Sequence, residues 1–188
     1  MTDEVLEQAE TSAGSKSVRL VPLPAAAMSA LLQGDLPGAS AAAGVALTEY
    51  LMTDEFLPVW RIRINQLGFA PGSALWSAHV ALAEPDGVTV GHAGFHGPPT
   101  EAGMVEIGYS VDPGYRRRGY AKAMLRELLQ RAAAEPGVRA VRATISPGNT
   151  ASLATIAGFG FAQVGMQWDE EDGLEIIFEV RVPTVRPG

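Results

Sequence analysis

The stretch that decides the fold reads MVEIGYSVDPGYRRRGYAKAMLRELLQRAAAEPG, from Met104 to Gly137. Turn residues bound its first part and predict a strand over 104–111, which ends at Asp112-Pro113-Gly114. A helix is predicted over 119–134, before Pro136-Gly137, because apolar residues recur at helical spacing: Ala121, Met124, Leu125, Leu128, Leu129 and Ala132. Residues 138–145 alternate as a strand, which runs parallel to the first strand if the helix is a crossover.

Three arginines and a glycine stand at the start of this helix, in the loop Arg116-Arg117-Arg118-Gly119-Tyr120-Ala121. A helix N-terminus presents unpaired N–H groups and the positive end of its dipole, which together suit a pyrophosphate. Gly119 lets the backbone approach an anion closely, and the arginines neutralise its charge. The alternative is a solvated basic surface, but cations at this end of a helix oppose its dipole unless an anion compensates. The loop therefore predicts an anion site.

The rest of the chain completes a single α/β (α+β) domain over residues 18–188, behind a polar tail, 1–17, that we expect to be disordered. Before the central stretch we expect a strand over 18–23, a helix over 24–33, breaks at Gly34 and Pro37-Gly38, and a mostly helical region over 39–68 interrupted at Pro58. Residues 76–83 and 88–95 form a predicted hairpin. After it, a helix over 149–157 precedes strands over 161–168 and 174–182, joined by an acidic turn.

Composition narrows the classes of function. The chain has 188 residues, of which 47% are hydrophobic and 19% charged, and no apolar run approaches the length of a membrane helix. The net charge of −7 disfavours nucleic-acid partners. Cysteine is absent, which excludes disulfides, thiolate chemistry and cysteine-ligated zinc. The acidic start lacks the features of a signal peptide, so we expect a cytoplasmic protein without membrane contacts.

Two motifs in sequence order resemble the GNAT superfamily of acetyltransferases. Arg116-x-x-Gly119-x-Ala121 is similar to the Gln/Arg-x-x-Gly-x-Gly/Ala signature between that family's fourth strand and the next helix. Downstream, Asn149-x-x-Ser152 followed by Gly160-Phe161 looks like its second motif. The segment Glu106-Ile107-Gly108-Tyr109, with Arg19-Leu-Val-Pro-Leu near the start, is most similar to the RimJ/RimL-like branch. The resemblance covers about residues 18 to 181.

This resemblance implies a fold, a cofactor and its contacts. It implies a mixed, mostly antiparallel central sheet with helices on both faces, and parallel fourth and fifth strands splayed around acetyl-CoA. Backbone groups of Tyr109, Ser110 and Val111 would pair with the pantetheine arm, and Asn149, with Ser152, would line it. The pyrophosphate would lie on Arg116 and Arg118 and on the amides of Arg117, Gly119, Tyr120 and Ala121.

The candidate catalytic groups lie in or beside the same two motifs. Glu106 is the candidate base, because a glutamate in this strand has that role in several family members; the alternative is an outward-facing residue or a partner for an arginine. The usual tyrosine acid, seven residues after the Asn, is replaced by Ile156. Ser152 is a substitute hydroxyl donor, or else a helix-start residue that bonds the backbone. His79, His92 or His96 could face the acceptor, and we expect no metal site.

The resemblance thus predicts an enzyme that transfers an acetyl group from acetyl-CoA to a primary amine of a small molecule or a protein N-terminus. Two alternatives stay open: a catalytically silent acyl-CoA sensor, and an RNA-binding patch on Arg116–Arg118, which the net charge disfavours. The sequence does not identify the amine, and it leaves the oligomeric state open, with a homodimer as one arrangement.

Overall fold

A computed structural model describes residues 16–69, 73–170 and 173–182, and it contains one seven-stranded sheet in the order β1-β2-β3-β4-β5-β7-β6. The first four strands form an antiparallel meander, β4 and β5 are parallel, and β7 pairs antiparallel with both β5 and β6. The strands are β1 (Val18–Pro22), β2 (Ala78–Ala83), β3 (Val88–Phe95), β4 (Met104–Val111), β5 (Ala140–Ile145), β6 (Ala162–Asp169) and β7 (Gly173–Arg181). The predicted mixed sheet is confirmed, and the insertion of β7 between β5 and β6 is new.

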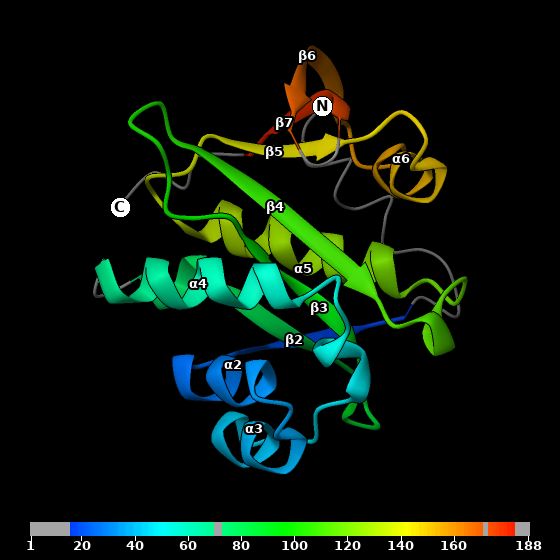
Figure 1. Ribbon diagram of the computed structural model, residues 1–188. Helices are drawn as coiled ribbons and strands as arrows, with labels where there is room; N and C mark the ends of the chain where they lie inside the picture. The colour runs from blue at the N-terminus through cyan, green and yellow to red at the C-terminus, as the bar shows by residue number, and fades with distance from the viewer. Residues whose placement is uncertain (1–15, 70–72, 171–172, 183–188) are drawn as a thin grey trace.

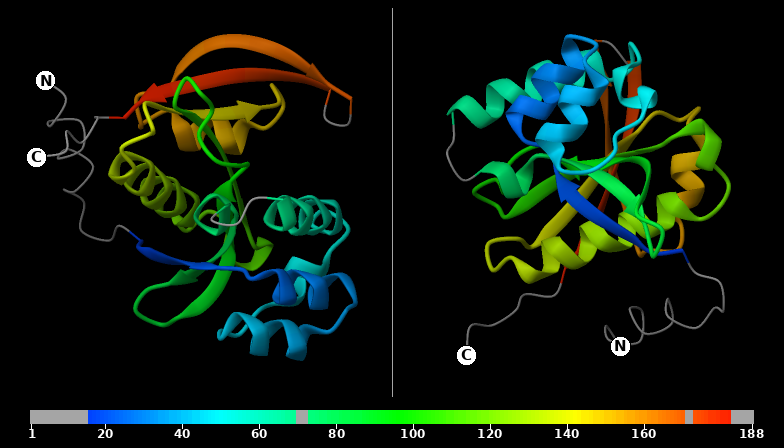
Figure 2. Two further views of the ribbon diagram at one scale, coloured as in Figure 1. Left: turned by 90° about the vertical axis from the view of Figure 1, so that its left-hand side faces the viewer. Right: turned by 90° about the horizontal axis from the view of Figure 1, so that it is seen from below.

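Helices cover both faces of the sheet (Figures 1 and 2). One face carries α5 (Tyr120–Ala134) and α6 (Thr150–Ile156), and the other carries α2 (Ala25–Leu32), α3 (Leu36–Ala43) and α4 (Leu57–Phe69). Short 3₁₀ turns lie in the connections: η1 (Glu49–Met52), η2 (Ser73–Trp76) and η3 (Pro113–Tyr115). None of the helices in the described ranges has the length and apolarity needed to cross a membrane.

Each face of the sheet has its own hydrophobic core. The apolar stripe of α5, centred on Met124, Leu125 and Leu128, is fully buried against β1, β3, β4 and β5. On the opposite face, Trp60 of α4 is fully buried with residues of α2 and β2, and its indole N–H donates to the Leu51 carbonyl at 2.7 Å. Burial of a large apolar side chain contributes about 1.5–3 kcal/mol, so these two cores hold both helix layers against the sheet.

Two prolines stand in helices where the sequence predicts breaks. Pro37 and Pro58 are the second residues of α3 and α4, so neither interrupts a helix and both predictions are wrong. Proline is tolerated in the first turn because an N–H there has no acceptor within the helix. Asp35 caps α3 by accepting the Gly38 amide at 2.9 Å, and α3 ends at Gly44, whose φ is 69°.

Only the end of the predicted N-terminal tail, residues 16 and 17, lies within the described chain. Residues 1–15 of the predicted tail lie outside the described residues. The last two tail positions lead directly into β1: the Ser17 carbonyl accepts the Glu84 amide at 3.1 Å, and the Lys16 ammonium lies 5.6 Å from the centre of the Tyr120 ring. Order in the described chain therefore begins slightly before the predicted strand.

Two buried histidines predict how the fold responds to acid. Burial, with the charge of Arg131 second, lowers the pKa of His79 to about 4, against an opposing contact with the Ser77 carbonyl. Burial lowers the pKa of His92 to about 3, with smaller contributions from Arg63, His79 and His96. Below about pH 6.5 the unfolded chain gains protons that the folded chain does not, so the free energy of unfolding should fall as the pH drops.

We expect a loss of up to about 2 kcal/mol per buried histidine between pH 7 and pH 5, measured by urea unfolding. Replacing His92 with Gln should flatten the pH dependence, because an amide does not titrate, even if it lowers stability overall. An unchanged slope in His92→Gln would contradict this assignment.

Candidate active site

The parallel strands β4 and β5 pair at one end and then separate. Their register holds only from Met104↔Ala140 to Glu106↔Arg142. A cleft of about 230 Å³ opens beyond this point, lined by Ile107, Gly108, Tyr109, Ala143, Thr144, Ile145, Ser146, Asn149, Ser152 and Glu175. The separation expected from the resemblance is therefore present. Among the described residues, the backbone groups of β4 beyond Glu106 have no strand partner on this side, so they can bond an extended ligand.

The loop of residues 116–121, called the arginine loop below, lies in the connection from β4 to α5. Asp112 fixes the turn by accepting the Gly114 amide at 2.9 Å, and Arg116 Nε donates to the Val111 carbonyl at 3.0 Å. Gly119 is the N-cap of α5 with a φ of 90°, and Arg117 has a φ of 58°. In the described part of the chain, the amides of Gly119, Tyr120 and Ala121 have no backbone acceptor. These free donors at a helix start are suited to a pyrophosphate.

The glycine at position 119 is required by its backbone angle rather than by space. A side chain there would meet only Lys16 Cγ, at 3.7 Å. The left-handed φ of 90°, however, is strained for any residue with a Cβ and worst for a β-branched one.

The remaining residues predicted to contact CoA divide between the two faces of the sheet. Tyr109, Asn149 and Ser152 line the cleft. The Asn149 side-chain oxygen accepts the Ser152 amide at 3.1 Å as the N-cap of α6, which leaves only its NH₂ group for a ligand. The Ser110 hydroxyl faces the other way and bonds the Tyr50 hydroxyl at 2.5 Å and Glu55 Oε1 at 3.3 Å. Only backbone groups of Ser110 are thus available to the arm.

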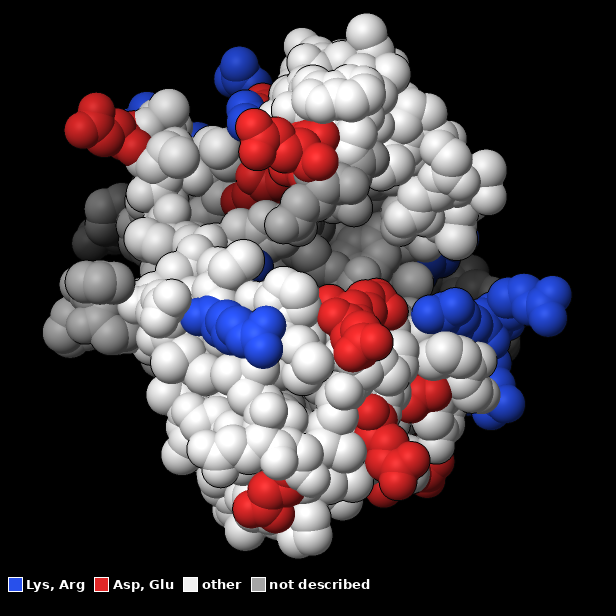
Figure 3. All heavy atoms as spheres, in the orientation of Figure 1, with Lys and Arg blue, Asp and Glu red and all other residues white. Residues whose placement is uncertain are grey.

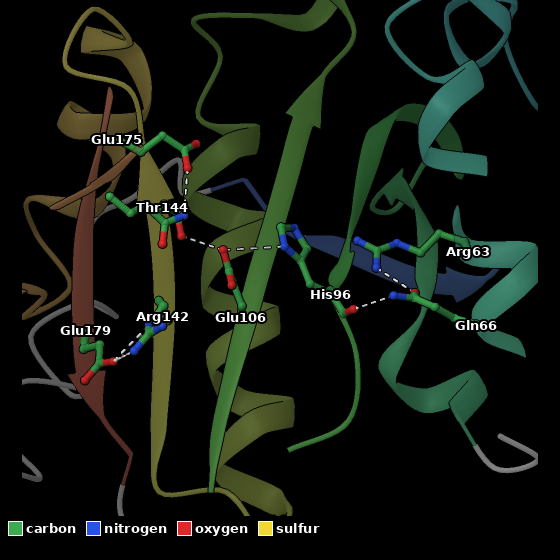
Figure 4. A network of polar contacts seen from close by, with 9 residues as sticks. Arg63, Gln66, His96, Glu106, Arg142, Thr144, Glu175 and Glu179 are labelled. Carbon is green, nitrogen blue, oxygen red and sulfur yellow. Dashed lines mark hydrogen bonds and ion pairs between the residues drawn. The ribbon is translucent and has the colours of Figure 1, made fainter. Parts of the chain in front are cut away.

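Glu106 lies at the mouth of the cleft, between two polar neighbours (Figure 4). Thr144 Oγ1 donates to Glu106 Oε1 at 2.5 Å, and His96 Nδ1 lies 3.6 Å from the same oxygen. Oε2 has no partner among the described residues. Arg142, whose side chain bonds Glu179 at 2.7 Å, does not pair with Glu106. The carboxylate is 28% exposed, so it can reach a ligand in the cleft.

A line of polar groups continues from Glu106 toward α4 (Figure 4). The His96 carbonyl accepts Gln66 Nε2 at 3.0 Å, and Gln66 Oε1 accepts Arg63 Nη1 at 2.9 Å. Burial and then the nearby charge of Arg63 lower the pKa of His96, whereas Glu106 opposes the shift. His96 is therefore mainly neutral at neutral pH.

The other two histidines are buried. His79 lies on the α5 face, and His92 points to the same face as its cross-strand neighbour Ser110 but packs against the rings of Phe56 and Trp60. Within the described ranges, no three metal-ligating side chains lie close enough together to hold a metal ion.

Sequence reasoning missed several residues of this site. Thr144 and Glu175 belong to predicted strands, but only the order of strands in the sheet brings them to the cleft. Tyr50 lies 60 residues from Ser110 and carried no motif. His96, placed just after β3, was named among three histidines, and no local pattern could single it out.

Comparison with known proteins agrees with this geometry. A family described as "Acetyltransferase (GNAT) domain" matches residues 45–162. The uncharacterized N-acetyltransferase YjdG of Bacillus subtilis (strain 168) is 35% identical over 72 residues, which are 38% of this chain and 43% of that protein, so the match spans less than half of the relative.

Solved structures share the fold at low sequence identity. A spermidine N-acetyltransferase SpeG chimera from Vibrio cholerae and hSSAT superposes with a TM-score of 0.62 at 10% identity, over 88% of this chain and 95% of that one. The aminoglycoside acetyltransferase AAC(6')-Ib in complex with coenzyme A gives 0.57 at 16% identity, over 89% and 95%. The fold is thus that of an acetyltransferase of the GNAT type.

The chain belongs to the GNAT acetyltransferase family, since the family match covers more than half of its residues.

Gly119 offers a direct test of the anion site. Gly119→Val should weaken CoA binding at least about tenfold, because the new side chain strains the left-handed backbone that aims the loop amides. The matched control is Gly137→Ala, at a turn glycine with open space around it. Isothermal titration with CoA measures both; equal affinity of the two variants would contradict a role for this loop.

Proposed function

We propose that this enzyme transfers the acetyl group of acetyl-CoA to a primary amine by direct attack in a ternary complex. The observation that carries the proposal is the cleft between β4 and β5, which has free helix-start amides at one end and the Glu106 carboxylate at its mouth. From the sequence of the segment Glu106-Ile107-Gly108-Tyr109, we also propose that the chain belongs to the RimJ/RimL-like branch.

Donor binding uses the backbone more than side chains. The unpaired edge of β4 at Tyr109, Ser110 and Val111 bonds the amides of the pantetheine arm, as a short added strand would. The pyrophosphate lies on the loop from Arg116 to Ala121, where helix-start amides and guanidinium groups meet its charge. The Asn149 NH₂ group contacts the arm from the β5 side.

Glu106 is the proposed base. Thr144 holds Oε1, so Oε2 is left to take a proton from the ammonium form of the acceptor, directly or through a water. The neutral amine then attacks the thioester carbonyl, which is polarised by a backbone amide near Val111. Ser152, partly exposed at the cleft, is the proposed donor of the proton that the departing CoA sulfur takes up.

A small cationic amine is the acceptor to test first. Figure 3 shows a hollow in this face with acidic side chains above and below it and basic ones toward its right-hand end. Glu175 lines the cleft, Glu106 bonds the lining residue Thr144, and Glu55 bonds Ser110. Negative charge there favours an acceptor with more than one ammonium group. The two solved relatives are named for spermidine and for an aminoglycoside, which fits this class.

Replacing Glu106 by Gln tests the catalytic assignment. We expect kcat to fall about 10²- to 10⁴-fold, as for loss of a general base, with CoA affinity nearly unchanged. Release of CoA thiol, followed with Ellman's reagent on a panel of amines and peptides, measures turnover. Glu179→Gln is the matched control, because Glu179 is equally exposed but pairs with Arg142 away from the cleft.

Equal activity of the two glutamine variants would contradict the role of Glu106. Tight CoA binding by the unmodified enzyme, without turnover of any amine, would instead favour the silent acyl-CoA sensor.

We further propose a homodimer formed through β6. This strand is one of the two edges of the described sheet, and its side chains Val164, Met166 and Trp168 are 55%, 60% and 76% exposed at alternate positions. The register shifts between Gln163 and Gly165, but no charged residue or proline interrupts 162–168, so two common protections of an edge strand are missing. Antiparallel pairing of an edge with its own copy obeys a two-fold axis, which suits a second copy of this chain.

Light scattering during gel filtration should therefore show a dimer, and Trp168→Glu should give a monomer because it buries a charge at the contact. Ile62→Glu, at an equally apolar but isolated exposed position on α4, should stay dimeric. A monomeric unmodified protein would refute the dimer.

A further inference from the structure

The hydroxyl of Tyr109 is a buried polar atom without a hydrogen-bond partner of good geometry among the described residues. Tyr109 belongs to β4 and lines the cleft, and its hydroxyl lies beside those of Ser152 and Thr155 on α6. A buried hydroxyl is costly to leave unpaired, so its position calls for a partner in the working enzyme.

Of its two neighbours, only Ser152 still has a proton to pass to a ligand. The Thr155 hydroxyl can accept from Tyr109, but its own proton is donated to the Ala151 carbonyl at 2.8 Å. Ser152 uses its backbone amide to cap α6 and has no other hydrogen bond for its hydroxyl in the described chain. Ser152 also lines the cleft and is partly exposed, whereas the Tyr109 oxygen is buried. The serine hydroxyl can therefore accept a hydrogen bond from Tyr109 and donate its own proton to a ligand in the cleft.

We propose that Tyr109 is a positioning residue that acts through Ser152, by donating a hydrogen bond to the serine oxygen while the serine proton moves to the CoA sulfur. This inference rests on the proposed acetyl transfer. It supplies a tyrosine hydroxyl near the thiol even though the position where the family usually has one is Ile156, which is buried in the core.

The proton balance is closed without any further reactant. Glu106 removes one proton from the ammonium, and the amine nitrogen then bonds the thioester carbon. As the carbon–sulfur bond breaks, its electron pair goes to sulfur, which takes the Ser152 proton. The nitrogen loses its second proton to water, Ser152 recovers one from water, and Glu106 gives its proton to the solvent, so that one proton is released overall with CoA thiol and amide. Tyr109 keeps its own proton throughout.

The electrostatics agree with a donor that stays neutral. Burial raises the pKa of Tyr109, and its contacts with Ser152 and Thr155 only oppose the shift. The hydroxyl therefore carries its proton throughout the physiological range, as a hydrogen-bond donor must.

A double-mutant cycle tests the inference. Tyr109→Phe should lower kcat about tenfold and leave the KM for acetyl-CoA within about twofold, because the lost hydrogen bond matters only as the thiol departs. In a Ser152→Ala background the same change should alter kcat less than about twofold, since the group it acts through is gone. Thr155→Val is the control and should keep full activity.

Equal losses from Tyr109→Phe in both backgrounds would overturn the inference, and so would a matching loss in Thr155→Val. A large change in CoA affinity would show a purely structural role. If the unmodified enzyme turns over no amine, the proposed function fails instead. The ionisation of bound CoA, followed by thiolate absorbance against pH, then still decides: the thiol should ionise at lower pH with Tyr109 and Ser152 present than in the double variant, and identical curves would refute the pair.

Discussion

The separation of β4 from β5 is the constraint on which the rest of this site depends. It is held open from both sides, because each strand is bound to its other neighbour where the two part. Residues from Ile107 to Val111 of β4 stay paired with β3, and all of β5 stays paired with β7. Neither strand can move to close the gap without losing a ladder of backbone hydrogen bonds. The unpaired edges are therefore a permanent feature that a ligand backbone can complete.

Charge is divided around this gap in a way that suits the two proposed substrates. The arginine loop and the start of α5 stand at the end that the proposal assigns to an anionic donor, and Glu106 and Glu175 stand on the side that it assigns to the amine. The overall negative charge of the chain makes the local positive loop more distinctive. Such a separation orients both substrates before any reaction occurs, and orientation accounts for a large part of catalysis in transfers of this kind.

The elements that could be predicted are those whose signals lie within a short stretch of sequence. The strand, loop and helix from Met104 to Ala134 follow from turn residues and a 3.6-residue period, and the structure reproduces their bounds within one residue. Sheet order could not be predicted, because the pairing of β7 with β5 joins segments whose local patterns look alike. The prediction of a break at Pro58 is wrong because no capping residue in the sequence marks the start of α4, so this first-turn proline looks like an interruption.

The site divides in the same way. Motif residues such as Gly119 and Ser152 are recognisable because backbone geometry fixes their type and spacing. The partners of Glu106 are not, since Thr144 and His96 reach it through strand order and a rotamer, neither of which leaves a sequence pattern. The Tyr50–Ser110 contact joins residues 60 positions apart and leaves no sequence pattern either. The sequence thus predicts a donor site, whereas the surroundings of Glu106 become visible only in the structure.

The most direct test of this account is a crystal structure of the protein with CoA. The account predicts that the pantetheine arm lies between β4 and β5 and bonds the backbone of residues 109–111. The pyrophosphate would lie on the amides of residues 117–121, and the sulfur beside Ser152 and Glu106. CoA bound elsewhere, with the gap between the strands empty, would contradict it.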